Sequence, residues 1–224
     1  MNTQLNIYLI RHTKPLIATG TCYGQLDCPV SDDYEQQLAK ISGCFKDKKI
    51  TAIYSSPLQR CSLLAEDLAK VHLNKGATLL QSNHAQASYV QSTHKQSVIY
   101  DKRFKEINFG DWEGEKWNDI ARIKIDEWNE NRLYFEFPNG ETPAHFHDRV
   151  LQAWSELITT NFLTQNPINI LLVAHSGVIC STLSRYLELS LENVTELTVD
   201  YASISQITLK NNKLKQVFVN QKSI

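Results

Sequence analysis

Two histidines and two arginines are the residues of this sequence whose types best fit one chemistry. Arg11 directly precedes His12, Arg60 follows later in the chain, and His175 stands directly before Ser176. A neutral imidazole is a competent nucleophile near neutral pH because its unperturbed pKa is about 6.5. The planar fork of an arginine matches two phosphate oxygens at once. Phosphoryl transfer needs such a nucleophile and such cations, so these residues predict a phosphate-transfer site.

Apolar runs that are typical of buried strands precede each of these groups. The three runs are Leu5–Ile10, Ile50–Tyr54 and Asn169–Ala174. Ligands of an open α/β sheet bind just beyond the carboxyl ends of its strands. We therefore expect the two arginines and the two histidines to converge on one crevice, although they lie far apart in the sequence.

Helical patterns alternate with these strands, which favours an α/β fold. One apolar stripe follows Ser31 as its expected N-cap, and another follows Ser56-Pro57 with the proline at the first helical position. Further helices are predicted after Thr142-Pro143 and over Val178–Leu189. We expect a mostly parallel, open sheet with helices on both faces.

The C-terminal part predicts a β-hairpin that adds an antiparallel edge strand, because Asn211-Asn212 separates the strand-like runs Ala202–Leu209 and Leu214–Val219. A chain of 224 residues suits one domain over 1–224. Between 74 and 101 the pattern fades into a polar stretch, in which only Ala77–Leu80 and Val98–Tyr100 resemble strands. We interpret this stretch as an insertion or a cap.

Composition excludes several classes of partner. The formal net charge is −1 and no basic tract is present, so we expect neither a nucleic acid nor a membrane surface as a partner. The run Ile7–Ile10 is too short for a signal peptide or a membrane span, which favours a cytoplasmic protein. The five cysteines lack CxxC spacing and are expected to be free thiols. The oligomeric state stays open.

A metal site is not expected. His145 and His147 are the pair that most resembles a ligand set, but residues two apart on a helix point to different faces. We therefore predict neither a metal nor an organic cofactor.

Four segments resemble, in order, the motifs of the histidine phosphatase superfamily (phosphoglycerate mutase-like). They are Leu9–Thr13, Ser55–Arg60, Glu106–Gly114 and Ala174–Gly177. The resemblance implies a phosphoglycerate mutase-like fold and a metal-independent phosphomonoesterase with a phosphohistidine intermediate. It implies that His12 is the nucleophile, that Arg11, Arg60 and His175 form the phosphate pocket, and that Glu106 is the general acid. The residue types and spacing alone do not single out Glu106 among its acidic neighbours.

Within this superfamily, Thr21–Val30 is similar to the corresponding segment of α-ribazole phosphatases, which implies α-ribazole 5′-phosphate as the small phosphorylated substrate. The resemblance implies that Tyr23, Gly24 and Gln25 contact the phosphate or the leaving group, and Ser176 joins them as a binding residue. One departure matters: Ala18 stands where the family commonly has an asparagine. Such a hydrogen bond to a charged group contributes about 1.5–3 kcal/mol. Candidate replacements are Thr19, Thr21 and Gln25.

Gly140-Glu141 resembles a family segment that precedes a helix, although a plain turn and helix cap explains it equally well. Three other functions stay open beside the α-ribazole assignment. They are a broad-specificity small-molecule phosphatase, a phosphoglycerate mutase, and an inert module that binds phosphorylated ligands. The last of these would tolerate loss of His12 or Glu106, and both residues are present.

Overall fold

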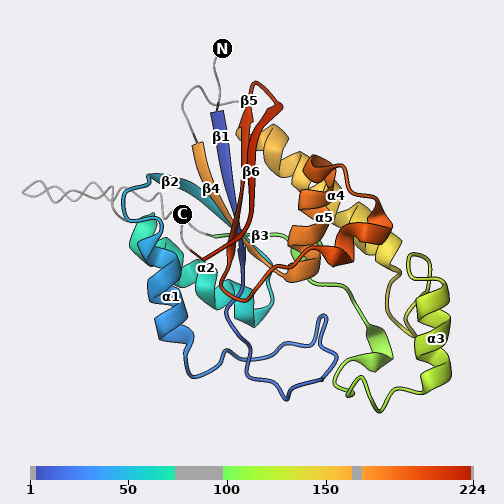
Figure 1. The fold of residues 1–224 in the computed structure, drawn as a ribbon. Helices are drawn as coiled ribbons and strands as arrows, with labels where there is room; N and C mark the ends of the chain where they lie inside the picture. The colour runs from blue at the N-terminus through green and yellow to red at the C-terminus, as the bar shows by residue number, and fades with distance from the viewer. Residues whose placement is uncertain (1–3, 74–97, 163–167, 223–224) are drawn as a thin grey trace, which may run out of the picture.

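The computed structural model describes residues 4–73, 98–162 and 168–222, which form a mixed six-stranded sheet with the strand order β3-β2-β4-β1-β5-β6 (Figure 1). The neighbours β3, β2, β4 and β1 run parallel, while β5 and β6 pair antiparallel at one edge. This confirms the predicted sheet. The strands are β1 (Gln4–Arg11), β2 (Ile50–Ser55), β3 (Ile99–Tyr100), β4 (Ile168–Ala174), β5 (Ile204–Lys210) and β6 (Lys213–Gln221).

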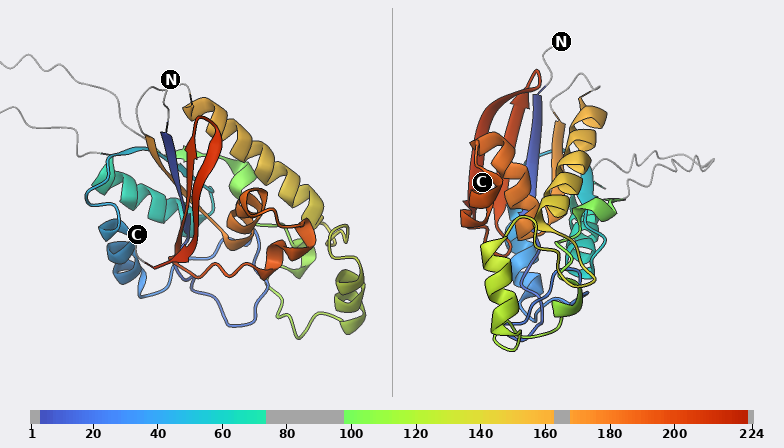
Figure 2. Two further views of the ribbon diagram at one scale, coloured as in Figure 1. Left: turned by 45° about the horizontal axis from the view of Figure 1, so that its top comes forward. Right: turned by 90° about the vertical axis from the view of Figure 1, so that its right-hand side faces the viewer.

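Helices cover both faces of the sheet, as Figures 1 and 2 show. On one face lie α1 (Tyr34–Gly43) and α2 (Gln59–His72). On the other lie α4 (Pro143–Asn161) and α5 (Ser176–Leu187), whereas α3 (Arg122–Glu130) stands apart at the end of the molecule that holds the carboxyl end of β1 (Figure 1). The described ranges also contain the short 3₁₀ helices η2 (Lys102–Phe104), η3 (Gly110–Trp112) and η4 (Leu191–Glu196).

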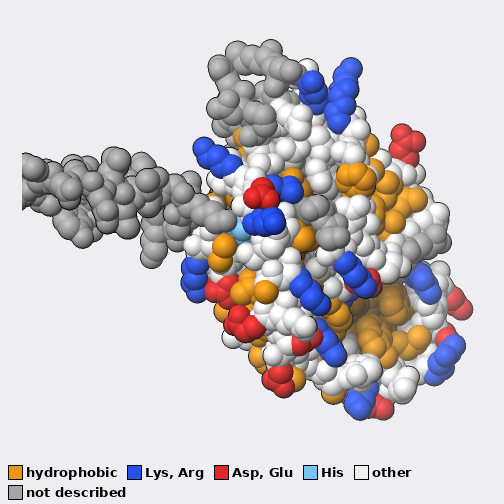
Figure 3. Space-filling model, turned by 60° about the vertical axis from the view of Figure 1, so that its left-hand side comes forward, with side chains coloured by type: hydrophobic (Ala, Val, Ile, Leu, Met, Phe, Trp, Pro, Cys, Tyr) orange, Lys and Arg blue, Asp and Glu red, His pale blue; other side chains and the backbone are white. Residues whose placement is uncertain are grey.

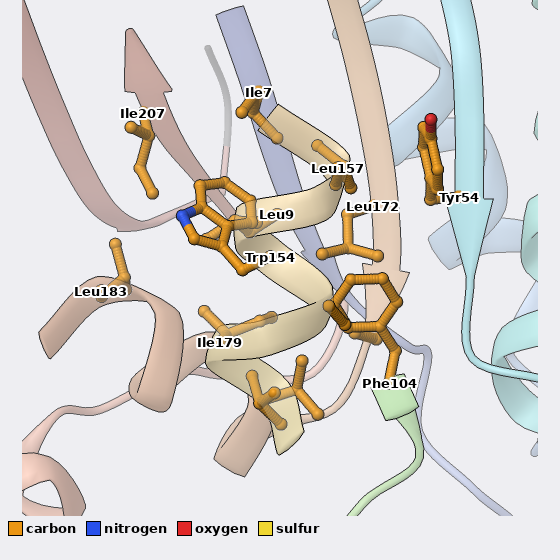
Figure 4. Close-up of a cluster of buried hydrophobic side chains, with 14 of the residues drawn as sticks. Ile7, Leu9, Tyr54, Phe104, Trp154, Leu157, Leu172, Ile179, Leu183 and Ile207 are labelled. Carbon is orange, nitrogen blue, oxygen red and sulfur yellow. The ribbon is translucent and has the colours of Figure 1, made fainter. Parts of the chain in front are cut away.

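The alternation of side chains along β1 divides the core into two layers. Ile7 and Leu9 pack with Trp154 of α4 in one cluster, which Figure 4 shows. Tyr8 and Ile10 point to the opposite face and pack in the cluster that includes α1 and α2. Successive side chains of a strand face opposite sides, so a strand buried on both faces reads as a continuous apolar run.

The parallel pairing brings three strand ends to one edge of the sheet. Arg11 is paired with Ala174 across β1 and β4, and Ser55 is paired with Val173 across β2 and β4. The residues that follow these positions are therefore neighbours in space. This is the edge at which the sequence analysis predicted the phosphate-transfer site.

Two predicted helix starts are wrong. The first helix begins at Tyr34, with Asp33 rather than Ser31 at its N-cap and no side-chain cap; the Ser31 hydroxyl donates to the carbonyl of Lys14 and to the carboxylate of Asp33. The second begins at Gln59, two residues after Pro57; Ser56 Oγ accepts from the N–H of Leu58, which lies just outside the helix.

Other local predictions are confirmed. Thr142 caps α4, because its hydroxyl accepts from the N–H of His145. Asn211 and Asn212 both have positive φ, which a two-residue hairpin turn of this kind requires.

Part of the predicted insertion, residues 74–97, lies outside the described residues, and with it the strand expected at Ala77–Leu80. The strand expected at Val98–Tyr100 is present as the short β3. Within the described ranges, no helix is both long and apolar enough to cross a membrane.

Candidate active site

The ends of β1, β2 and β4 are joined by backbone hydrogen bonds. The N–H of His12 donates to the carbonyl of Ala174 (3.0 Å), and the N–H of Ser56 donates to that of Val173 (3.0 Å). The rings of His12 and His175 lie edge to face, with their centroids 5.2 Å apart. The two histidines that the sequence placed at strand ends are therefore in contact.

His12 is buried with a defined tautomer. Its Nδ1 lies 2.7 Å from the carbonyl oxygen of Thr13. A carbonyl can only accept, so Nδ1 carries the proton and Nε2 keeps its lone pair. Burial lowers the pKa of His12 well below 6.5, and the positive charge of Arg60 lowers it further. The imidazole is thus neutral and nucleophilic at Nε2.

Arg60 is fully buried as the second residue of α2. Its two terminal nitrogens donate to the carbonyls of Leu26 (2.8 Å) and Gly24 (2.6 Å). Arg11 donates through Nη1 to the carbonyl of Val199 (2.5 Å). In both arginines Nε is buried without a hydrogen-bond partner among the described residues. The buried cation of Arg60 and the half-buried cation of Arg11, each with an unused donor, form a pocket suited to an anion.

His175 is fully buried at the start of α5, and its Nε2 lies 2.8 Å from the hydroxyl of Ser56. Burial lowers its pKa well below 6.5, with the charge of Arg60 as the next cause. The sulfur of Cys61 lies 3.5 Å from the same nitrogen. Ser56 and Cys61 therefore fix the orientation of the His175 ring beside His12.

Glu106 is the carboxyl group of the site. Burial raises its pKa above the ordinary value of 4.5, and the charges of Arg60 and Arg11 oppose the shift. Two backbone N–H groups, of Ile107 and Gly177, donate to its oxygens at 3.1 Å each. These contacts hold the carboxyl group in one place, while burial favours its protonated form.

The loop Tyr23–Gln25 is fastened to the segment that carries Glu106. A Cβ on Gly24 would overlap the carbonyl oxygen of Ile107, so glycine is required for this close approach. The side chain of Gln25 donates to the carbonyl of Glu106 (3.1 Å). The backbone N–H of Gln25 donates to the carboxylate of Glu113 (2.7 Å).

A cavity of about 510 Å³ opens beside these groups. Its walls beyond the phosphate pocket are mostly aromatic and apolar, and one face of the molecule shows a hollow in its lower right part in which hydrophobic side chains gather between charged ones (Figure 3). The wall includes Phe109, Trp117, Trp128, Leu133, Phe137 and Phe146. The rings of Trp117 and Trp128 are nearly parallel, at 17°.

Most of the residues predicted for the site meet at this cavity. Its lining includes Arg11, His12, Tyr23, Arg60, Glu106 and Ser176. Three predicted residues lie behind the wall instead: His175 contacts His12, while Gly24 and Gln25 act through their contacts with Arg60 and the Glu106 segment. Of the three candidates to replace the family asparagine, Thr21 lines the cavity.

Several residues of the site were missed by the sequence analysis. Tyr201 stacks on Arg11, and the tryptophans of the wall come from a segment without clear periodicity. Ser56 stood in a recognised motif, but only the structure connects it to His175. Nothing in the local sequence around Tyr201 marks it as a site residue.

Glu141 is tied to the site through Arg149. Its carboxylate binds Arg149 at 2.5 and 2.8 Å and accepts from the N–H of Asn108. Arg149 in turn donates to the carbonyls of Arg103, Lys105 and Glu106. Glu141 thus does more than cap a turn. Over the described part of the chain, no group of three or more side chains is arranged to hold a metal ion.

Comparisons with known proteins agree with this fold. The chain is 23% identical to "Putative phosphoserine phosphatase 2" of Hydrogenobacter thermophilus, over 96% of this chain and 95% of that protein. The solved α-ribazole phosphatase of Shigella flexneri has a TM-score of 0.75 and 22% identity, with 98% of each chain covered. A phosphoserine phosphatase mutant of Entamoeba histolytica, solved with phosphoserine, has a TM-score of 0.70 and 20% identity, with 97% of this chain and 98% of that one covered.

At these identities the solved structures show a shared fold. The family is shown separately, because the model of the histidine phosphatase superfamily (branch 1) matches residues 7–79 and 80–222. The motifs, the fold and this match agree, and the chain belongs to the histidine phosphatase superfamily.

Proposed function

We propose that this protein is a phosphomonoesterase that transfers the phosphoryl group of its substrate first to His12 and then to water. The observation that carries the proposal is the buried, neutral ring of His12, whose Nε2 lone pair is free in a pocket that also contains Arg11 and Arg60. A nucleophile between two guanidinium groups is the arrangement that phosphoryl transfer requires.

In the first step, Nε2 of His12 attacks phosphorus and the bond to the leaving oxygen breaks. Arg11 and Arg60 stabilise the charge on the non-bridging oxygens. Glu106, whose pKa burial raises, gives its proton to the leaving oxygen. The products are an alcohol, a phosphorylated His12 and an ionised Glu106.

In the second step, water attacks the phosphorus of phosphorylated His12. Glu106 takes the proton of the attacking water, the nitrogen–phosphorus bond breaks, and inorganic phosphate leaves. His12 and Glu106 then return to their starting forms. In both steps His175 lies against the ring of His12, and its own ring is held in place by the hydroxyl of Ser56. All charges and protons come from side chains, so the proposal needs no metal and no cofactor.

The alternatives are less well supported. An inert module that binds phosphorylated ligands would need the arginines, but not a neutral nucleophile together with a buried acid beside them. A mutase must protect the phosphorylated histidine from water and rebind its product in a closed pocket. The cavity here is open to solvent along an apolar wall, which favours hydrolysis.

For the substrate, we propose α-ribazole 5′-phosphate, on the basis of the Thr21–Val30 segment and the character of the cavity. Aromatic and apolar walls favour an uncharged ring system in the leaving group. The leaving group of phosphoserine carries an ammonium and a carboxylate, and burying charges beside Trp117, Trp128 and Phe137 is costly, although Arg132 and Glu192 also line the cavity. A broad-specificity phosphatase is the second candidate, because the phosphate pocket itself does not select a leaving group.

Rapid-quench mass spectrometry of the intact protein tests the mechanism. With α-ribazole 5′-phosphate we expect a transient mass increase of one phosphoryl group in the wild type and none in His12→Ala. The matched control is His145→Ala, because His145 is an exposed histidine of α4; it should label as the wild type does. An adduct that persists in His12→Ala contradicts the assignment of the nucleophile.

Substrate selection is tested by kcat/KM for α-ribazole 5′-phosphate, phosphoserine and p-nitrophenyl phosphate. We expect α-ribazole 5′-phosphate to exceed phosphoserine by at least about 100-fold. Equal values for all three would leave the phosphohistidine mechanism standing and replace the α-ribazole assignment by broad specificity.

A further inference from the structure

The segment before β5 runs beside the end of β1. The N–H of Arg11 donates to the carbonyl of Ser203 (3.1 Å), and the N–H of Ala202 donates to the carbonyl of His12 (3.2 Å). These bonds extend the antiparallel pairing of β1 and β5 to the residues that precede Ile204, the first residue of β5. Tyr201 therefore lies next to both the nucleophile and the first arginine.

The ring of Tyr201 makes two contacts with these residues. The guanidinium carbon of Arg11 lies 3.8 Å from the centre of the ring, which is close for a cation on an aromatic face. The ring of His12 lies 5.6 Å away, centroid to centroid. Arg11 also donates to the carbonyl of Val199, so a single short segment holds its guanidinium by both an aromatic face and a carbonyl oxygen.

The hydroxyl of Tyr201 is connected to the second arginine, Arg60, through Tyr23. It lies 2.5 Å from the hydroxyl of Tyr23, and the ring of Tyr23 lies 5.3 Å from the guanidinium carbon of Arg60. The two tyrosines thus connect Arg11 to Arg60. Burial raises the pKa of Tyr23, and the hydrogen bond with Tyr201 raises it further.

The backbone around Tyr201 is constrained. Ala202 has a φ of 56°, a left-handed conformation that is unfavourable for a residue with a Cβ. The N–H of Asp200 donates to the side chain of Asn220 on β6 (2.7 Å). Strained backbone of this kind persists where the surrounding structure fixes it, and it is common at functional sites.

We propose that Tyr201 is a positioning residue for phosphate binding, which fixes the guanidinium of Arg11 and, through Tyr23, its spacing from Arg60. The inference rests on the proposed function of this pocket. Arg11 and Tyr23 line the cavity whereas Tyr201 is absent from its lining, so Tyr201 acts through these two residues. Two arginines bind a phosphate well only when their donors are already oriented, because ordering them on binding costs conformational entropy.

Orthovanadate and inorganic phosphate are the probes, because their binding to the pocket does not depend on the identity of the leaving group. In isothermal titration, Tyr201→Leu should weaken both by about ten-fold, the loss expected for one partly desolvated cation–aromatic contact. Tyr201→Phe keeps the aromatic face and should bind within about three-fold of the wild type, the cost of a single neutral hydrogen bond. In an Arg11→Met background, Tyr201→Leu should add less than about two-fold, because the cation of the contact is then absent.

Tyr100→Leu is the matched control. Tyr100 is similarly exposed (44% against 37% for Tyr201) and its hydroxyl is also hydrogen-bonded, to Glu66, but it lies on β3 at the opposite edge of the sheet. It should bind both probes as the wild type does. If Tyr201→Leu does not fold, probe binding is compared between Tyr201→Phe and Tyr201→His. We expect Tyr201→His to bind the probes more weakly, since a histidine ring offers a poorer face to a cation.

The two proposals fail in different ways. A wild type that binds neither probe overturns the proposed function. A wild type that binds them, together with a folded Tyr201→Leu that binds equally well, overturns the role of Tyr201 alone. A full ten-fold loss in the Arg11→Met background also overturns it, because the effect would then not pass through Arg11.

Discussion

Gly177 donates its backbone N–H to the carboxylate of Glu106, 71 positions earlier in the chain, at 3.1 Å. Gly177 is the second residue of α5, where backbone N–H groups have no partner within the helix. A Cβ at this position would overlap Oε1 of Glu106 and would meet the ring of Phe146 at 3.0 Å. The absence of a side chain on Gly177 therefore determines where the proposed general acid can lie.

Gly177→Ala should displace Glu106 and impair protonation of the leaving oxygen. We expect kcat for an alkyl phosphate to fall about 10- to 100-fold, within the range that general acids contribute. With p-nitrophenyl phosphate the fall should be smaller, since p-nitrophenolate leaves without a proton. Gly43→Ala, at the end of α1, is the control because no atom lies within 4 Å of its added Cβ. Equal losses on both substrates would mean that the substitution damages the phosphate pocket rather than the acid.

The pH dependence of kcat/KM should show an acidic limb that arises from His12 and an alkaline limb that arises from Glu106. His12 must be neutral, and because its pKa lies well below 6.5, activity should fall with decreasing pH only below that value. Glu106 must be protonated in the first step, so activity should fall as pH rises through its pKa, which lies above 4.5. Glu106→Gln should therefore abolish the alkaline limb, measured with an alkyl phosphate, whose leaving oxygen needs the proton. An alkaline limb that is unchanged in Glu106→Gln would assign it to another group.

Chelation should leave activity unchanged. Arg11 and Arg60 supply the positive charge that a metal would otherwise provide at the phosphate oxygens, and His12 supplies the nucleophile. We expect the same kcat/KM before and after dialysis against EDTA. Loss of activity that Mg²⁺, Mn²⁺ or Zn²⁺ restores would contradict the metal-free mechanism.

The sheet and the strand-end residues could be predicted because their signals are local. Leu5–Ile10 is apolar throughout since both faces of β1 are buried, and His12 follows directly. The α3 segment could not be predicted in this way. No residue of α3 is buried, so it lacks an apolar stripe, and the nearby packing depends on distant partners such as Cys22 with Trp112.

Tyr201 shows the same limit within the site. It belongs to no motif, and it reaches Arg11 only because β5 pairs with β1. The predicted start of α1 is wrong for a related reason: the hydroxyl of Ser31 makes contacts with Lys14 and Asp33, and the helix begins three residues later at Tyr34. Local sequence shows what a side chain could bind, whereas the fold determines which partner it meets.

Arg149 joins the Glu106 segment to α4, and its removal should destabilise the fold as well as the site. Its guanidinium makes a two-point ion pair with Glu141 and donates to the carbonyls of Arg103, Lys105 and Glu106. The side chains of this pair are 21% and 18% exposed. Arg149→Met would therefore leave a partly buried carboxylate and three carbonyl groups without their donor.

We expect Arg149→Met to lower the free energy of unfolding by about 2–4 kcal/mol, from urea titrations at pH 7, because the partner groups stay partly buried. Arg122→Met is the matched control. Arg122 pairs with Asp126 on the surface of α3 and is 83% exposed, so its loss should change stability by no more than about 0.5 kcal/mol. If both substitutions had the same small effect, the contacts of Arg149 would be dispensable for the fold. A large loss for Arg149→Met with kcat unchanged in the folded fraction would instead separate its structural role from the position of Glu106.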